Sequence, residues 1–184
     1  MKQNNWFDPF YIQSHLTEEE VKIQNIIRKF CNKELRKKVV IKNRNHEFDK
    51  NLYPKFGSIG VLGQTLKSHG GSGTSNLAYG LAAYEIEKID SSYRSSISVQ
   101  SSLVIHPIYE FGSENQKDKF LPDLIKGEKI GCFGLTESEA GSDPSSMKTT
   151  FKKIKDGYIL NGSKNWITNA PIADIFIIWA IEEN

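Results

Sequence analysis

Apolar residues in the first part of the chain recur at the intervals of an amphipathic helix. Between residues 17 and 40 apolar positions recur at roughly helical intervals, and they are Val21, Ile23, Ile27, Phe30 and Leu35. Thr17 and Glu20 have the spacing of a capping box, in which each side chain bonds to the other residue's backbone N–H. The pattern predicts one long helix that begins after Thr17.

Similar patterns predict four more helices before residue 127. A short one surrounds Phe56 and ends among Gly57, Gly60 and Gly63, and a glycine-rich connector at 69–73 follows. A helix at 76–90 offers the core positions Leu77, Leu81, Tyr84 and Ile89. Another helix spans 95–111. The last spans 117–126, with Ser113 and Gln116 as a capping box and Gly127 as its end.

Beyond Gly127 the spacing changes to short apolar or alternating runs, which are typical of strands. The runs cover 129–135, 147–154, 158–161 and 175–181. Asp156-Gly157 between the second and third predicts a tight primed hairpin turn, because glycine tolerates the positive φ of such turns. We therefore predict an α+β protein, with an all-helical domain at 1–127 and an antiparallel barrel or sandwich at 128–184. The β-domain is expected to be incomplete, since the last strand has no following partner.

Composition and charge change this picture little. The 24 Lys and Arg residues nearly balance the 22 Asp and Glu residues, so the net charge of +2 favours neither nucleic acid nor membrane partners. Cys31 and Cys132 have no metal-ligand or redox spacing, and the histidines are scattered, so no metal site is predicted. Reduced cysteines and the lack of a targeting pattern indicate a cytoplasmic location, or the mitochondrial matrix in a eukaryote.

Two groups of residues suggest chemistry. A flavin needs short hydroxyls, close backbone approach and an aromatic wall, and the loop from Gly134 to Ser142 together with Trp166 and Thr168 offers them. A plain surface loop and a core tryptophan are the alternatives. Arg94 could clasp a carboxylate through charge-assisted hydrogen bonds. Its alternative is a structural ion pair with Glu87 or Asp90.

Four motifs occur together in this order: 133–137 (FGLTE), 141–143 (GSD), 161–164 (NGSK) and 166–168 (WIT). Together they closely resemble the acyl-CoA dehydrogenase family. Segments 93–103 (YRSSISVQSSL) and 106–109 (HPIY) narrow the resemblance to glutaryl-CoA dehydrogenases, from about residue 7 onward. Ser138 departs from the family, which usually has proline there. The family has a further C-terminal helical bundle, which this chain does not resemble in any part.

The resemblance implies a set of binding residues. The cofactor FAD would contact Phe133, Gly134, Leu135, Thr136, Glu137, Gly141, Ser142, Trp166, Ile167 and Thr168. The substrate would contact Glu87, Arg94, Ser95, Ser98 and Ser142. Thr136 is expected to bond the pyrimidine edge of the flavin, and Thr168 the nitrogen that accepts hydride.

The resemblance also implies an activity. Oxidation of the α,β-carbons of glutaryl-CoA, with loss of carbon dioxide, would give crotonyl-CoA and pass electrons to electron-transferring flavoprotein. The catalytic glutamate would lie in the missing bundle, so we expect no catalytic residue here and no activity from these 184 residues alone. Family members are commonly homotetramers. A dehydrogenase for a monocarboxylic short-chain acyl-CoA, or a noncatalytic binding or assembly module, are the alternatives.

Overall fold

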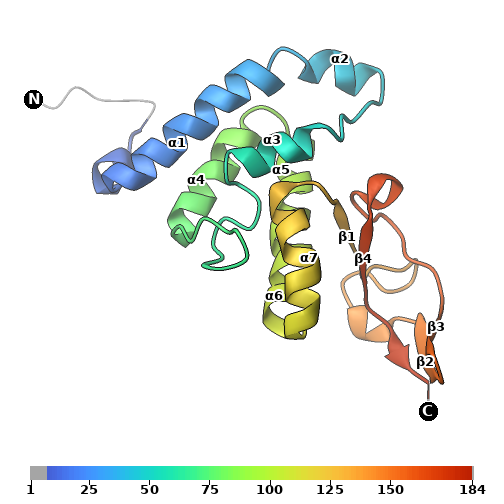
Figure 1. Cartoon of the computed structure of the whole chain (residues 1–184). Coiled ribbons are helices and arrows are strands. Elements are labelled where there is room, and N and C mark those ends of the chain that lie inside the picture. The colour runs from blue at the N-terminus through green and yellow to red at the C-terminus, as the bar shows by residue number, and fades with distance from the viewer. Residues whose placement is uncertain (1–7, 184) are drawn as a thin grey trace, which may run out of the picture.

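The computed structural model describes residues 8–183, with helices in the first two thirds of this range and strands beside them in the last third (Figure 1). The helices are α1 (Glu18–Phe30), α2 (Val39–Arg44), α3 (Leu52–Ser58), α4 (Asn76–Glu87), α5 (Ser91–Ser98), α6 (His106–Phe111) and α7 (Glu114–Lys126). π-helical turns η2 (Cys31–Leu35) and η3 (Val99–Ile105) extend α1 and join α5 to α6. Short 3₁₀ turns are η1 (Ile12–His15), η4 (Pro144–Ser146) and η5 (Ala170–Ile172).

The helix ends follow the local signals in the sequence. Both predicted capping boxes form, at Thr17 with Glu20 and at Ser113 with Gln116. Gly127 ends α7 with a φ of 73°, and an added Cβ there would lie 2.2 Å from the Tyr53 carbonyl oxygen. Both the left-handed conformation and this close approach require glycine.

The predicted core face of α4 is partly wrong. Leu81 is buried and Ile89 is half-buried, but Leu77 and Tyr84 are exposed. Helix α4 is apolar around most of its circumference, so periodicity alone does not select the face that packs. The buried positions include the small residues Ala78 and Ala82, which allow close contact with neighbouring helices.

The strands form two small sheets. They are β1 (Gly131–Gly134), β2 (Thr150–Ile154), β3 (Gly157–Asn161), β4 (Ile175–Ile178) and β5 (Ile181–Glu182). β1 pairs with β4, and the second sheet has the order β3-β2-β5. The helical-then-β fold class is confirmed, but the pairing is mixed: β2–β3 is antiparallel, whereas β1–β4 and β2–β5 are parallel. Within residues 8–183 the strands do not close into a barrel.

The hairpin between β2 and β3 forms, with a different turn from the predicted one. Ile154 pairs with Gly157, so Lys155 and Asp156 are the two turn residues. Neither of them has a positive φ, so the turn is not of the primed type. Gly157 is instead the first residue of β3.

Gln100 joins the helical part to the first strand. Its side chain is completely buried in η3, where Nε2 donates to the carbonyl oxygens of Leu124 at 3.0 Å and Lys129 at 2.9 Å. Its Oε1 accepts from the Gly131 N–H at 2.8 Å. Asn169 Nδ2 donates to the Gly131 carbonyl oxygen at 3.1 Å. These side chains fix where β1 leaves the helices.

Candidate functional site

The first candidate cluster lies where α4 ends and α5 begins. Asp90 accepts from Ser92 N–H as the N-cap of α5, and this turn brings Glu87 toward Arg94. Arg94 Nε lies 2.8 Å from Glu87 Oε2, and both side chains are roughly two-fifths exposed. The structure therefore contains one of the two ion pairs that the sequence offered as an alternative to a carboxylate clasp, the one with Glu87.

The ion pair leaves part of the guanidinium available. The contact with Glu87 uses only Nε, so Nη1 and Nη2 can still donate to a second carboxylate. Hydrogen bonds from Ser91 and Arg94 lower the pKa of Glu87, which keeps its charge beside Arg94. Arg94 and Ser98 also line a very small cavity, together with residues of α4 and of the segment before it. Ser95 is half-buried on α5.

The second candidate cluster begins in β1. Phe133 is half-buried, and its ring meets that of Trp179 edge-on at 6.1 Å. Gly134 is buried, and an added Cβ would lie 2.6 Å from Ile178 Cδ1. A side chain at this position would displace the end of the Ile178 side chain on β4. Leu135 and Thr136 follow, both half-buried.

The loop after Thr136 opens toward solvent. Gly141 and Ser142 are exposed, and an added Cβ at Gly141 would meet no described atom within 4 Å. Asp143 then accepts from Ser145 N–H at 3.1 Å and caps the turn η4. No described atom lies close enough to Gly141 to require glycine at this position. A ligand that lies close to the backbone would account for it.

Trp166 is not a core residue. Its side chain is 91% exposed and its φ is 61°, a left-handed conformation that is unfavourable for a bulky residue. The alternative of a packed core tryptophan is therefore wrong. Ile167 beside it is half-buried and Thr168 is exposed. Strain and exposure together are typical of a side chain that contacts a ligand.

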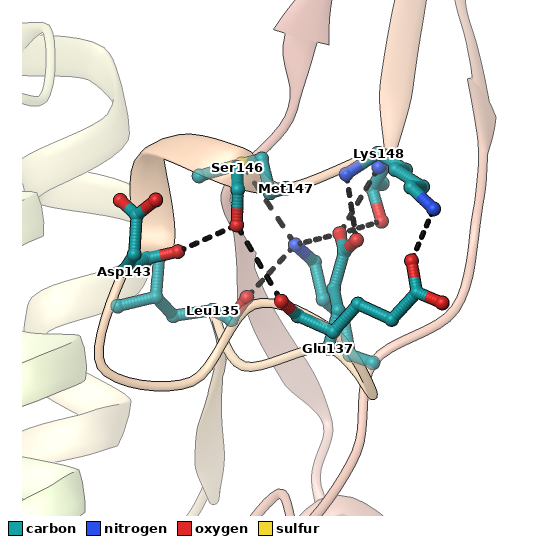
Figure 2. Close-up of polar contacts among 9 residues, drawn as sticks. Leu135, Glu137, Asp143, Ser146, Met147 and Lys148 are labelled. Atoms are coloured by element: carbon teal, nitrogen blue, oxygen red, sulfur yellow. Dashed lines mark hydrogen bonds and ion pairs between the residues drawn. The ribbon is translucent and has the colours of Figure 1, made fainter.

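Both carboxylate oxygens of Glu137 bond to protein groups, although the resemblance implied a cofactor contact. Its Oε1 lies 2.7 Å from Lys164 Nζ and accepts from Thr149 N–H at 3.0 Å and from Thr149 Oγ1. Its Oε2 accepts from Lys148 N–H at 2.6 Å. Figure 2 shows Glu137 close to the labelled residues Leu135 and Lys148. The bonds from Lys164, and then those from Thr149 and Lys148, hold the pKa of Glu137 at about 2.

Glu137 should therefore contribute to the acid sensitivity of the fold. Its pKa lies below the ordinary value of 4.5, so its stabilising effect is complete above pH 4.5 and is lost as the pH falls toward 2. We expect Glu137→Gln to melt at a lower temperature than wild type at neutral pH, and the two melting temperatures to converge near pH 2. Circular dichroism melts across this range measure the difference. A difference that stays constant with pH would contradict the assignment.

Sequence reasoning missed three residues that organise this cluster. Lys164 stood in a recognised motif without a role, and its ammonium reaches both Glu137 and the Leu135 carbonyl oxygen at 3.0 Å. Asn165 N–H donates to the Thr136 carbonyl oxygen at 2.9 Å. Asn169 has a φ of 71° and is buried. The local signal for Asn169 was its residue type, since asparagine is enriched in the left-handed conformation.

A separate apolar groove lies between α6, α7 and β4. Its lining includes Phe111, Phe120, Phe176 and Trp179, and none of the sequence-predicted site residues. In the described part of the chain, no group of His, Cys, Asp and Glu side chains could hold a metal ion. No helix in residues 8–183 has the length and apolar character needed to cross a membrane.

Family models match nearly the whole chain. The N-terminal domain of acyl-CoA dehydrogenases matches residues 17–128, and the middle domain matches residues 132–184. The chain belongs to the acyl-CoA dehydrogenase family. The resemblance that the motifs suggested is thus confirmed.

Several relatives, whose names give different substrates, are similar to this chain. An acyl-CoA dehydrogenase of Bacillus subtilis is 39% identical over 91% of the chain and 44% of its own length. The short-chain-specific enzyme of Megasphaera elsdenii is 38% identical over 92% of the chain and 45% of its own. The structure of a Mycobacterium smegmatis glutaryl-CoA dehydrogenase in complex with FADH2 has a TM-score of 0.92 and 41% identity, over 95% of this chain and 45% of that one. The chain thus spans less than half the length of these acyl-CoA dehydrogenases.

Proposed function

We propose that the protein containing this chain is an FAD-dependent dehydrogenase that oxidises the α,β-carbons of glutaryl-CoA. The observation that carries the proposal is Arg94, which Glu87 holds at 2.8 Å through Nε while Nη1 and Nη2 can still donate. Loss of carbon dioxide would then give crotonyl-CoA, with electrons passed to electron-transferring flavoprotein. The relative from Mycobacterium smegmatis supports both the cofactor and the substrate.

The second cluster fits a flavin. Gly141 leaves open space, Thr136 and Ser142 supply hydroxyls, and Trp166 presents an indole from a strained backbone. Bound FAD would supply the electron acceptor for the hydride that leaves the substrate. In this proposal Phe133, Gly134, Leu135, Ile167 and Thr168 complete the walls of the flavin site, and Glu137 acts through its neighbours.

The first cluster fits the free carboxylate of a diacid thioester. A plain acyl chain would meet only apolar groups at the end of its pocket, whereas Arg94 offers Nη1 and Nη2 in a fork that matches a carboxylate. Glu87 fixes the position of the guanidinium and partly neutralises its positive charge. The carboxylate of the substrate would therefore bind without being held too tightly. Ser95 and Ser98 lie on the same helix and add hydroxyl donors, and Ser142 would contact the thioester arm.

The catalytic base lies outside this chain in the proposal, in the part of the relatives that the chain does not span. The isolated 184 residues would then be inactive. The homotetramer and the division at residues 127 and 128 remain predictions. A monocarboxylic short-chain acyl-CoA is a second candidate substrate, because the Megasphaera relative is short-chain specific and Arg94 already has a partner.

Measurements on the full-length product of the gene test both the proposed cofactor and the proposed reaction. We expect it to bind FAD with a visible flavin absorbance, and glutaryl-CoA to bleach this absorbance under anaerobic conditions, since reduction of the flavin removes it. Butyryl-CoA is the matched substrate without the second carboxylate. A colourless protein that does not bind added FAD would reject the enzyme and favour a noncatalytic module. Faster bleaching by butyryl-CoA would reject the diacid.

A further inference from the structure

The two walls of the proposed flavin site come from distant parts of the sequence, and specific bonds join them. Asn165 N–H donates to the Thr136 carbonyl oxygen at 2.9 Å, and Asn165 Nδ2 donates to Ser138 Oγ at 3.0 Å. Lys164 Nζ adds a bond to the Leu135 carbonyl oxygen at 3.0 Å. Residues 135–138 are thereby fixed to the residues directly before Trp166.

The ion pair of Lys164 with Glu137 anchors this junction. The two side chains are only 8% and 10% exposed, and their charged atoms lie 2.7 Å apart. Glu137 also accepts from Lys148 N–H and Thr149 N–H, so the pair ties a third segment to the same point (Figure 2). A shielded ion pair with all its partners satisfied allows little movement.

We propose that Lys164 and Glu137 are positioning residues that set the spacing between Thr136 and Trp166 across the flavin site. This inference rests on the proposed binding of FAD and refines it, because Glu137 acts here through the protein and not by touching the cofactor. Lys164 fixes the Leu135 carbonyl next to Thr136. It also fixes the backbone two residues before the strained Trp166.

The neighbouring pair of Lys148 with Glu139 provides a control. It is an ion pair of the same chemistry, but its side chains are 74% and 73% exposed. It links two positions of the same loop. Removing it changes the surface charge of the loop without releasing the junction.

The experiment compares four variants of the full-length protein, each reconstituted with FAD well below its melting temperature. The variants are Lys164→Met, Glu137→Gln, the double variant and the control Glu139→Gln, which removes the exposed pair without altering a partner of Glu137. We expect Lys164→Met to raise the Kd for FAD about 10-fold or more and to shift the flavin absorption bands, because a supporting contact of a site typically has this effect. The control should stay within about twofold of wild type.

The double variant separates positioning from stability. Removing both charges avoids leaving an unpaired charge in a shielded site. The double variant should therefore have a higher melting temperature than Glu137→Gln. Its Kd for FAD should remain raised, because the Leu135 carbonyl has still lost its donor. A normal Kd and spectrum in Lys164→Met, or a Kd that recovers together with the melting temperature, would overturn the inference. A wild-type protein that does not bind FAD would instead reject the proposed function itself.

Discussion

Replacing Arg94 with alanine should lower kcat/KM for glutaryl-CoA by about 30- to 150-fold, because a carboxylate that loses a close charged partner loses affinity of this size. The decrease in kcat/KM should affect mainly the diacid substrate. Butyryl-CoA carries no distal carboxylate, and we expect its kcat/KM to change by no more than about threefold. Steady-state kinetics of the full-length protein with both substrates measure the ratio.

Two further variants sharpen the test. Arg94→Lys keeps the positive charge and loses the planar fork of the guanidinium. Its kcat/KM for glutaryl-CoA should therefore lie between those of wild type and Arg94→Ala. Arg36→Ala removes an exposed arginine in the turn after η2, where it bonds Asn32, and should leave kcat/KM for both substrates unchanged. Equal losses with glutaryl-CoA and butyryl-CoA in Arg94→Ala would mean that Arg94 serves only the ion pair with Glu87.

Replacing Gln100 with alanine should lower the free energy of unfolding by about 3 to 5 kcal/mol, since it removes three hydrogen bonds and leaves their partners buried. The Leu124 and Lys129 carbonyl oxygens and the Gly131 N–H would all lose their side-chain partner. Urea unfolding of the chain, followed by circular dichroism, gives the free energy.

Gln116 provides the matched control for this variant. Its side chain is exposed and caps the start of α7 through the Ser113 N–H. Gln116→Ala should cost only about 1 kcal/mol, the usual effect of a lost cap. If Gln100→Ala were no more destabilising than Gln116→Ala, the three buried bonds would not hold the helical part to the first strand.

The features that the sequence predicted depend on local chemistry. The capping boxes at Thr17 and Ser113 and the helix end at Gly127 arise from contacts within a few residues. The residue types at these positions therefore predict them. The strand segments after Gly127 follow from the change of period. The cofactor motifs were found through their resemblance to a family, since a loop of glycine and serine has no specific signal by itself.

The features that the sequence did not predict depend on long-range packing. Whether Leu77 or Ala78 faces the core is decided by how closely α4 approaches its neighbours, which periodicity does not encode. The parallel pairing of β1 with β4 joins segments far apart in the chain. The pairing of Lys164 with Glu137 is of the same kind, because each residue alone looks like an ordinary surface charge.

The pairing of β1 with β4 also has a consequence for the order of folding. Gly131 pairs with Ile175, and the hairpin β2–β3 lies within the stretch that separates them. Closing so long a loop costs entropy before any strand contact compensates for it, so such pairs form late. We therefore expect the helices and the hairpin to acquire protection from hydrogen exchange first, and the loops of the proposed flavin site to become protected only in the final kinetic phase.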